Sequence, residues 1–179
     1  MLKAPTLKAQ DVLVVCKLWS LGGKSWTYAG LAEALLLSVG EVHHAVARCR
    51  QAQLVFSVRG DDVVSKRHFF DLLVTAVPRV FFAVRGGFDL GCPTSHSAPS
   101  LVERFASVRG DASSVPTIWP DPRGTVRGES LLPIYPSVPE AARKDDKLYE
   151  LLALIDTVRL GEHKTKKRAV EILERQILS

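Results

Sequence analysis

The sequence predicts an α+β fold that is mainly helical, and three features of the residue pattern support this class. Apolar residues recur at helical spacing through residues 7–51 and again from residue 137 to the C-terminus. Residues 54–64 instead have the composition of two strands joined by a turn. Residues 79–135 are rich in Gly, Pro and Ser with short apolar runs, which predicts a smaller irregular sheet joined by long loops.

Three helices are expected within the first 51 residues. The first covers residues 7–21 and ends at the Gly-Gly pair 22–23, the second contains TYAGLAEALLL, and the third begins with SVGEVHHAVARCRQAQ. Their inward faces are formed by Leu7, Val14, Leu18 and Leu21, by Leu31, Ala32 and Leu35, and by Val42, Val46 and Cys49. Helical spacing of these apolar residues predicts three packed, amphipathic helices.

Residues 27–51 have the features of a helix-turn-helix, in which two short helices meet at a fixed angle. Only about three residues separate the two helices, and Ala32 is small enough to allow close contact between them. Ser38 and Glu41 predict a capping box at the start of the second of these helices. Such a start leaves backbone amides and the positive end of the helix dipole facing outward, where a DNA phosphate can bind.

A strand, a turn and a second strand are expected next, at residues 54–57, 59–61 and 63–64. Ser65 is expected to cap the following helix, KRHFFDLLVTAV, and Pro78 is expected to end it. The change of pattern after this helix predicts two domains, residues 1–77 and residues 78–179.

In the second half, strands are expected at the apolar runs 80–84, 117–119 and 131–135, and Ser137 with Glu140 predicts a second capping box. The helices that follow have apolar stripes formed by Leu148, Leu151, Leu152, Ile155 and Val158, and by Ala169, Ile172, Leu173 and Ile177. Two interpretations of this C-terminal stripe remain open: a dimer interface, or packing in the core of a monomer.

The stretch WTYAGLAEALLLSVGEVHHAVARCRQAQLV and the strand pair after it resemble the winged helix-turn-helix of bacterial transcription regulators, the MarR-like group among them. The resemblance covers roughly residues 7–64, and Leu36 stands where such proteins usually carry a Gly in the turn. It implies an N-terminal winged helix-turn-helix that binds double-stranded DNA, with the recognition helix running from Ser38 to about Gln51. It also implies a cytoplasmic homodimer, because MarR-like regulators dimerise through terminal helices.

The residues expected to contact DNA are Lys24, Thr27, Tyr28, Ser38, Gly40, His43, His44, Arg48, Gln51 and Arg59. The two histidines can donate to base or phosphate acceptors, and Arg48 can make a bidentate contact to guanine or to phosphates. Lys24, Thr27 and Tyr28 are expected near the DNA backbone, and Arg59 at the tip of the wing. The alternative for each side chain is that it is simply solvated, and winged helices also dock proteins.

Arg59 belongs to one of four similar four-residue segments that end in Val-Arg-Gly, at 57–60, 83–86, 107–110 and 125–128. Their unequal spacing excludes a stacked repeat array. Only Arg59 is expected to contact DNA, whereas the segments that contain Arg85, Arg109 and Arg127 are expected to form turns or strand ends.

The composition fits a cytosolic protein without a metal site or cofactor. A net charge of +5 and a pI of about 9.3 are compatible with nucleic acid but do not require it. Three cysteines without a C-x-x-C pair argue against a disulfide framework or a thiolate zinc site. No apolar run approaches the length of about 18 residues that spans a bilayer, and the N-terminus lacks the apolar segment of a secretory signal.

Catalysis is not expected, because the chain lacks the nucleophile-elbow, phosphate-loop, dinucleotide-binding and zinc-protease motifs. In GCPTSHSAPS, Cys92, Ser95 and His96 lie close together, but their adjacency in a loop does not make a nucleophile and base. This loop is interpreted as a polar structural element or a surface for a ligand or partner. The basic cluster at 164–168 is interpreted as a solvated helix face, with contact to the DNA backbone as the alternative.

The function predicted from these observations is sequence-specific DNA binding by a transcriptional regulator that acts by occupying an operator. The alternative is a partner-binding module, such as the DNA-binding antitoxin side of a toxin–antitoxin or phage-defence pair. In that case residues 78–179 would bind the protein partner.

Overall fold

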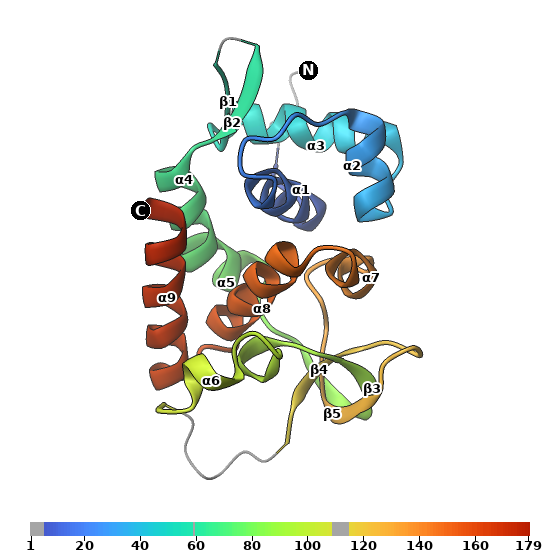
Figure 1. Cartoon of the computed structure of the whole chain (residues 1–179), viewed down its shortest axis with the longest axis vertical. Helices are drawn as coiled ribbons and strands as arrows, with labels where there is room; N and C mark the ends of the chain where they lie inside the picture. Colours follow the sequence, from blue (N-terminus) through green and yellow to red (C-terminus); the bar gives the residue numbers. More distant parts are fainter. Residues whose placement is uncertain (1–5, 59, 109–114) are drawn as a thin grey trace.

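The computed structural model describes residues 6–58, 60–108 and 115–179 and confirms the predicted α+β, mainly helical class (Figure 1). Its principal elements are α1 (Ala9–Ser20), α2 (Tyr28–Leu35), α3 (Val39–Gln51), β1 (Val55–Val58), β2 (Asp61–Val64), α4 (Lys66–Asp71), α5 (Val77–Val80), β3 (Arg85–Pro93), α6 (Val102–Phe105), β4 (Thr117–Pro120), β5 (Val126–Leu131), α7 (Val138–Arg143), α8 (Asp146–Leu160) and α9 (His163–Leu178). A π-helical stretch at Leu72–Ala76 joins α4 to α5.

The first three predicted helices and the predicted strand pair are present. Helix α1 contacts both α2 and α3, and Leu13, Leu31 and Val46 on these three helices are fully buried. Strands β1 and β2 pair antiparallel, from Val55 opposite Val64 to Val58 opposite Asp61. This hairpin extends beyond the helices at one end of the molecule (Figure 1).

The helical run after the hairpin differs from its prediction at both ends. Ser65 makes no side-chain capping hydrogen bond. Pro78 lies in the first turn of α5, a position where proline is tolerated, and the helical run continues past it to Val80. The predicted domain boundary between residues 77 and 78 therefore lies inside this run, and buried side chains from both sides of it share one apolar core.

The predicted small sheet is present, but two of its strands are shifted along the chain. Strand β3 pairs antiparallel with both β4 and β5, and β4 pairs parallel with β5, so the three strands close on one another. The expected strand at 80–84 is wrong, because the carbonyl oxygens of Phe81 and Phe82 accept hydrogen bonds from Arg159. The expected strand at 131–135 is also wrong, since β5 ends at Leu131.

Glycines allow the three strands to approach closely. A Cβ atom on Gly128 would lie 2.2 Å from the Pro116 carbonyl oxygen, and one on Gly91 would lie 2.0 Å from that of Trp119. These two positions therefore accept no side chain. In the Val-Arg-Gly segment at 125–128, the glycine is the residue that allows this close approach of the strands. Arg109 lies outside the described residues.

Helix α8 lies at the centre of the molecule, in contact with α1, α5, α7 and α9 (Figure 1). The predicted apolar stripe on α8 and its continuation on α9 are buried within the chain. Of the two interpretations, packing in the core is thus the one observed, and the stripe does not form a dimer interface. In the part of the chain that the structure describes, neither α8 nor another helix is long and apolar enough to cross a membrane.

The predicted capping box at Ser137 is wrong. Ser137 has helical backbone angles, with φ −79° and ψ −4°, and its hydroxyl oxygen has no hydrogen-bond partner among the described residues. Helix α8 is instead capped by Asp145, whose side chain accepts from the Leu148 N–H at 3.0 Å. The same carboxylate accepts from Lys17 Nζ at 2.6 Å and from the Ser20 hydroxyl at 2.9 Å, so it links α8 to the end of α1.

We expect Asp145→Ala to lower the free energy of unfolding at pH 7 by roughly 1–2 kcal/mol, as for loss of a helix cap. Although burial opposes it, hydrogen bonds from Lys17, the Leu148 N–H and Ser20 keep the pKa of Asp145 below its ordinary value. The folded state therefore gains stability above the unfolded pKa of about 3.9 and loses it as the pH falls.

Urea unfolding at pH 7 and pH 3 tests this expectation. The deficit of Asp145→Ala relative to the wild type should be smaller at pH 3. Asp146→Ala, at the exposed neighbouring position, is the matched control and should change little at either pH. An equal loss of unfolding free energy in Asp145→Ala at both pH values would contradict the interpretation that the ionised carboxylate of Asp145 caps the helix.

Candidate nucleic-acid interface

The turn between α2 and α3 depends on Leu36. Leu36 adopts the left-handed conformation, with φ 54° and ψ 45°, at the position where glycine is common in the resembled family. The Leu37 N–H then donates to the Ala32 carbonyl oxygen at 3.0 Å, which closes the turn. A leucine in this conformation is strained, so the packing of the two helices must stabilise it.

The predicted capping box at the start of α3 is confirmed. The Glu41 N–H donates to the Ser38 hydroxyl at 3.2 Å, and the Ser38 N–H donates to the Glu41 carboxylate at 2.8 Å. Hydrogen bonds from the Ser38 backbone and side chain lower the pKa of Glu41. Helix α2 is capped in a similar way by Thr27, whose hydroxyl accepts from the Gly30 N–H at 3.0 Å. Both helices of the predicted pair therefore begin at fixed residues.

Most of the predicted contact residues lie on the molecular surface. Exposed positions are Lys24, Thr27, Ser38, Gly40, His43, His44 and Gln51, and Tyr28 is half-buried. Helix α3 buries Val42, Ala45, Val46 and Cys49 against the other helices. The face of α3 that carries His43 and His44 is therefore exposed to solvent, and the opposite face is buried.

Arg48 is the exception, and its predicted outward position is wrong. Its guanidinium donates to both oxygens of Asp11, from Nε at 2.7 Å and from Nη2 at 2.6 Å. Asp11 is completely buried, and 17% of the Arg48 side chain is exposed. The hydrogen bonds to Asp11 raise the pKa of Arg48. The physical reason is that the flank of α3 at Arg48 faces α1, so this arginine neutralises a buried carboxylate.

Arg50 is exposed on α3 and was not among the predicted contacts. Its guanidinium donates to Asp62 of β2, with Nε 3.1 Å from Oδ1 and Nη2 2.7 Å from Oδ2. The hydrogen bond to Asp62 raises the pKa of Arg50. The sequence does contain a signal for this residue, because position 50 is seven residues after His43 and shares its helical face. Arg59 lies outside the described residues.

Aromatic rings connect the start of α2 to the exposed face of α3. The ring centroids of Trp26 and Tyr28 are 5.1 Å apart, those of Tyr28 and His43 are 5.2 Å apart, and those of His43 and His44 are 6.1 Å apart. We call these four side chains the aromatic row. It makes one surface of residues from the α1–α2 loop, α2 and α3.

Comparisons with protein-family models, curated proteins and solved structures found no match for this chain. The site is therefore interpreted from its own geometry. Within the described residues, no group of three or more His, Cys, Asp or Glu side chains is placed to hold a metal ion.

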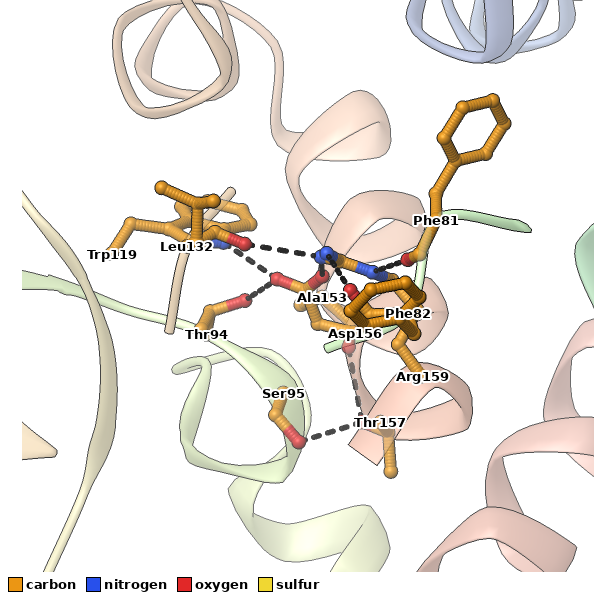
Figure 2. A network of polar contacts seen from close by, with 10 residues as sticks. All are labelled: Phe81, Phe82, Thr94, Ser95, Trp119, Leu132, Ala153, Asp156, Thr157 and Arg159. Carbon is orange, nitrogen blue, oxygen red and sulfur yellow. Dashed lines mark hydrogen bonds and ion pairs between the residues drawn. The ribbon is translucent and has the colours of Figure 1, made fainter. Parts of the chain in front are cut away.

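Thr94 and Ser95, in the segment where Cys92, Ser95 and His96 are close in sequence, belong to a buried polar network with residues of α8 (Figure 2). The Asp156 carboxylate accepts from the Thr94 hydroxyl at 2.9 Å and from Trp119 Nε1 at 2.5 Å. Ser95 lies 3.0 Å from the Thr157 hydroxyl. The loop is thus a structural element, as one of its two interpretations proposed.

The basic cluster at 164–168 lies at the start of α9, beside α6. Arg168 donates to the Arg104 carbonyl oxygen at 3.2 Å and to Glu171 at 3.3 Å. The opposite end of α9 contacts α4, which follows the hairpin (Figure 1). This places the cluster far from α2 and α3, in agreement with a solvated helix face.

Proposed function

We propose that the protein is a transcriptional regulator that binds double-stranded DNA through a winged helix-turn-helix formed by α1–α3 and the β1–β2 hairpin. In this proposal α3 is the recognition helix and enters the major groove with His43 and His44. Helix α2 lies across the DNA backbone, and the hairpin is the wing. Occupancy of an operator would then control transcription.

One observation carries this proposal: two short capped helices meet at a closed turn, and an antiparallel hairpin follows directly. The exposed edge of α3 has polar donors at Ser38, His43, His44 and Gln51, while its other edge is buried. Imidazole and amide groups at such positions can bind base edges or phosphates. The aromatic row connects this edge to α2, where contacts to the DNA backbone are expected.

Electrostatics set a limit on the proposed contacts. Arg48 is bound to Asp11, and Arg50 is bound to Asp62, so α3 offers fewer free cations than its composition suggests. The dependence of affinity on salt reports the number of phosphates contacted. We therefore expect a salt dependence that is measurable but smaller than that of strongly basic DNA-binding helices.

A selection from random duplexes, followed by fluorescence polarisation across a salt series, tests the proposal. The wild type should bind a subset of sequences, with affinity that falls as salt rises. Substitution of both His43 and His44 by alanine should weaken binding to the selected duplex about tenfold or more, since two donors to DNA are lost. His163→Ala changes an exposed histidine on α9 and is the matched control.

A second candidate function, the binding of a protein partner through residues 78–179, is favoured by exposed apolar side chains. Phe82, Val84 and Leu132 are 64%, 45% and 57% exposed, and the Leu132 N–H donates to the Val84 carbonyl oxygen. Exposed apolar clusters often mark interaction surfaces. This candidate includes the antitoxin side of a toxin–antitoxin or phage-defence pair. Absence of salt-sensitive binding to any duplex, together with a co-purifying protein, would favour it over the regulator.

A further inference from the structure

A cleft of about 290 Å³ lies between the α1–α2 loop and the hairpin. Its lining includes Lys24, Thr27 and Tyr28 together with Arg50 and Asp62. We call this the wing cleft. It combines an ammonium, a guanidinium and hydroxyl groups in one lining, and these are the groups with which proteins hold phosphate.

Arg50 retains free donors in the wing cleft. Asp62 accepts from Nε and Nη2, and the Tyr28 side chain is a further, weaker hydrogen-bond partner of the guanidinium, which has five N–H donors in all. The side chain of Arg50 is 44% exposed, whereas that of Asp62 is 8% exposed. A guanidinium held by a carboxylate along one edge can still donate from its outer edge. Asp62 therefore fixes the direction in which the remaining donors of Arg50 point.

Lys24 supplies a second cation. Its side chain is exposed and has no ion pair among residues 6–58, 60–108 and 115–179. The wing cleft also contains Asp61, so its formal charges balance in the free protein. Both oxygens of Asp62 already accept from Arg50, so Lys24 and the donors of Arg50 that face Tyr28 rather than Asp62 are the groups available to an anion.

The wing cleft is continuous with the proposed recognition surface. Tyr28 lines the cleft and its ring contacts His43 on the exposed face of α3. Arg50 is in the last turn of α3, whereas base edges are met by residues near the start of a recognition helix. A group bound beside Arg50 therefore lies toward the DNA backbone.

We propose that the wing cleft binds one phosphate of the DNA backbone between Lys24 and Arg50, and that Asp62 is a positioning residue that orients Arg50. This inference rests on the proposed DNA-binding function. The ligand class is a phosphodiester, which carries one negative charge and accepts hydrogen bonds through its two free oxygens. Contact with a phosphate contributes affinity and fixes the orientation of the protein, but does not distinguish sequences.

The test uses the full chain and the selected duplex, with affinity measured at several salt concentrations. Lys24→Gln and Arg50→Gln should each weaken binding about tenfold. Each should also lower the slope of affinity against salt by about one phosphate, equally for selected and unselected sequences. Lys167→Gln removes the same charge from the exposed surface of α9 and should leave the slope unchanged.

Substitution of two neighbouring carboxylates distinguishes the orientation of Arg50 by Asp62 from the effect of negative charge in the cleft. Asp61→Asn and Asp62→Asn each remove one negative charge from the wing cleft, but only Asp62 touches Arg50. Asp61→Asn should tighten binding, because repulsion of the phosphate is removed. Asp62→Asn should bind more weakly than Asp61→Asn, because Arg50 loses its orientation. Equal or tighter binding by Asp62→Asn would overturn the positioning role.

Neutral methylphosphonate groups, placed one at a time along the duplex, identify the phosphate itself. One position should weaken the wild type about tenfold yet have little further effect on Arg50→Gln. If the wild type binds but Arg50→Gln retains its affinity and salt slope, the phosphate site is wrong and the regulator stands. If the wild type binds no duplex in a salt-sensitive way, both proposals fail. Thermal melting of each variant verifies that it is folded.

Discussion

Replacement of Arg159 by leucine is expected to lower the free energy of unfolding by about 3–5 kcal/mol, as when one partner is removed from a buried ion pair. Arg159 Nη1 lies 2.5 Å from the Asp156 carboxylate, and both side chains are only 3% exposed. Its guanidinium also donates to the carbonyl oxygens of Phe81, Phe82 and Leu132 (Figure 2). Leucine leaves these acceptors and the carboxylate without that partner.

The pH dependence gives this prediction a second readout. Burial raises the pKa of Asp156, although Arg159, Thr94 and Trp119 oppose the shift. Loss of Arg159 should raise that pKa further, so the folded state is destabilised more as the pH rises and Asp156 ionises. Urea unfolding should therefore show a larger deficit for Arg159→Leu at pH 8 than at pH 5.

Arg175→Leu is a suitable control, because Arg175 is exposed on α9 and should change stability by less than about 0.5 kcal/mol. A deficit of Arg159→Leu below about 1 kcal/mol, or one that does not depend on pH, would contradict a stabilising role of the network. In that case the segment at 81–82 would be held to α8 by apolar packing alone.

The N-terminal helices and the hairpin were predictable because their signals are local. The Gly-Gly pair after α1, the Ser38–Glu41 capping box and the alternation before and after the turn each act within a few residues. Tertiary contacts agree with these local preferences, so the elements form where the pattern places them. The apolar stripe on α8 was also predictable from the sequence. The surface that packs against it was not, because the spacing of apolar residues does not indicate which element covers them.

The second half was less predictable because distant residues decide it. The apolar run at 80–84 has the composition of a strand. Two of its carbonyl oxygens, however, accept from Arg159, which is more than 70 positions away in the chain. Strand β3 pairs with β4 only from Gly91 to Pro93, where the absence of a side chain at Gly91 allows the close approach. Neither contact leaves a local signal, so propensity alone misplaced the strands.

At the candidate site, the exposed polar residues of α3 were predictable and the roles of its arginines were not. Helical spacing placed His43, His44 and Gln51 on the open face. Arg48 lies at the border of that face, and only the buried carboxylate of Asp11 on α1 draws it away. No spacing rule within α3 indicates a partner on another helix. Arg50 instead lies on the exposed face that carries His43.

Arg48→Ala is accordingly expected to act on stability, with a loss of about 3–5 kcal/mol in the free energy of unfolding. Asp11 would keep the Lys8 N–H, which donates at 2.8 Å, but would lose two hydrogen bonds and its countercharge. Arg50→Ala removes an ion pair whose arginine is 44% exposed, so it should cost less than Arg48→Ala, which leaves a completely buried carboxylate. Urea unfolding of the two variants measures how much each arginine contributes to the free energy of unfolding.

DNA binding distinguishes the structural role of Arg48 from its predicted contact role. Affinity of Arg48→Ala, measured at low temperature and divided by the folded fraction, should equal that of the wild type. A double variant with Asp11→Asn and Arg48→Met should recover much of the lost stability, because neither buried charge then remains unpaired. If Arg48→Ala were instead as stable as the wild type and bound DNA about tenfold more weakly, Arg48 would be a contact residue. Its hydrogen bonds to Asp11 would then have to exchange for hydrogen bonds to DNA on binding.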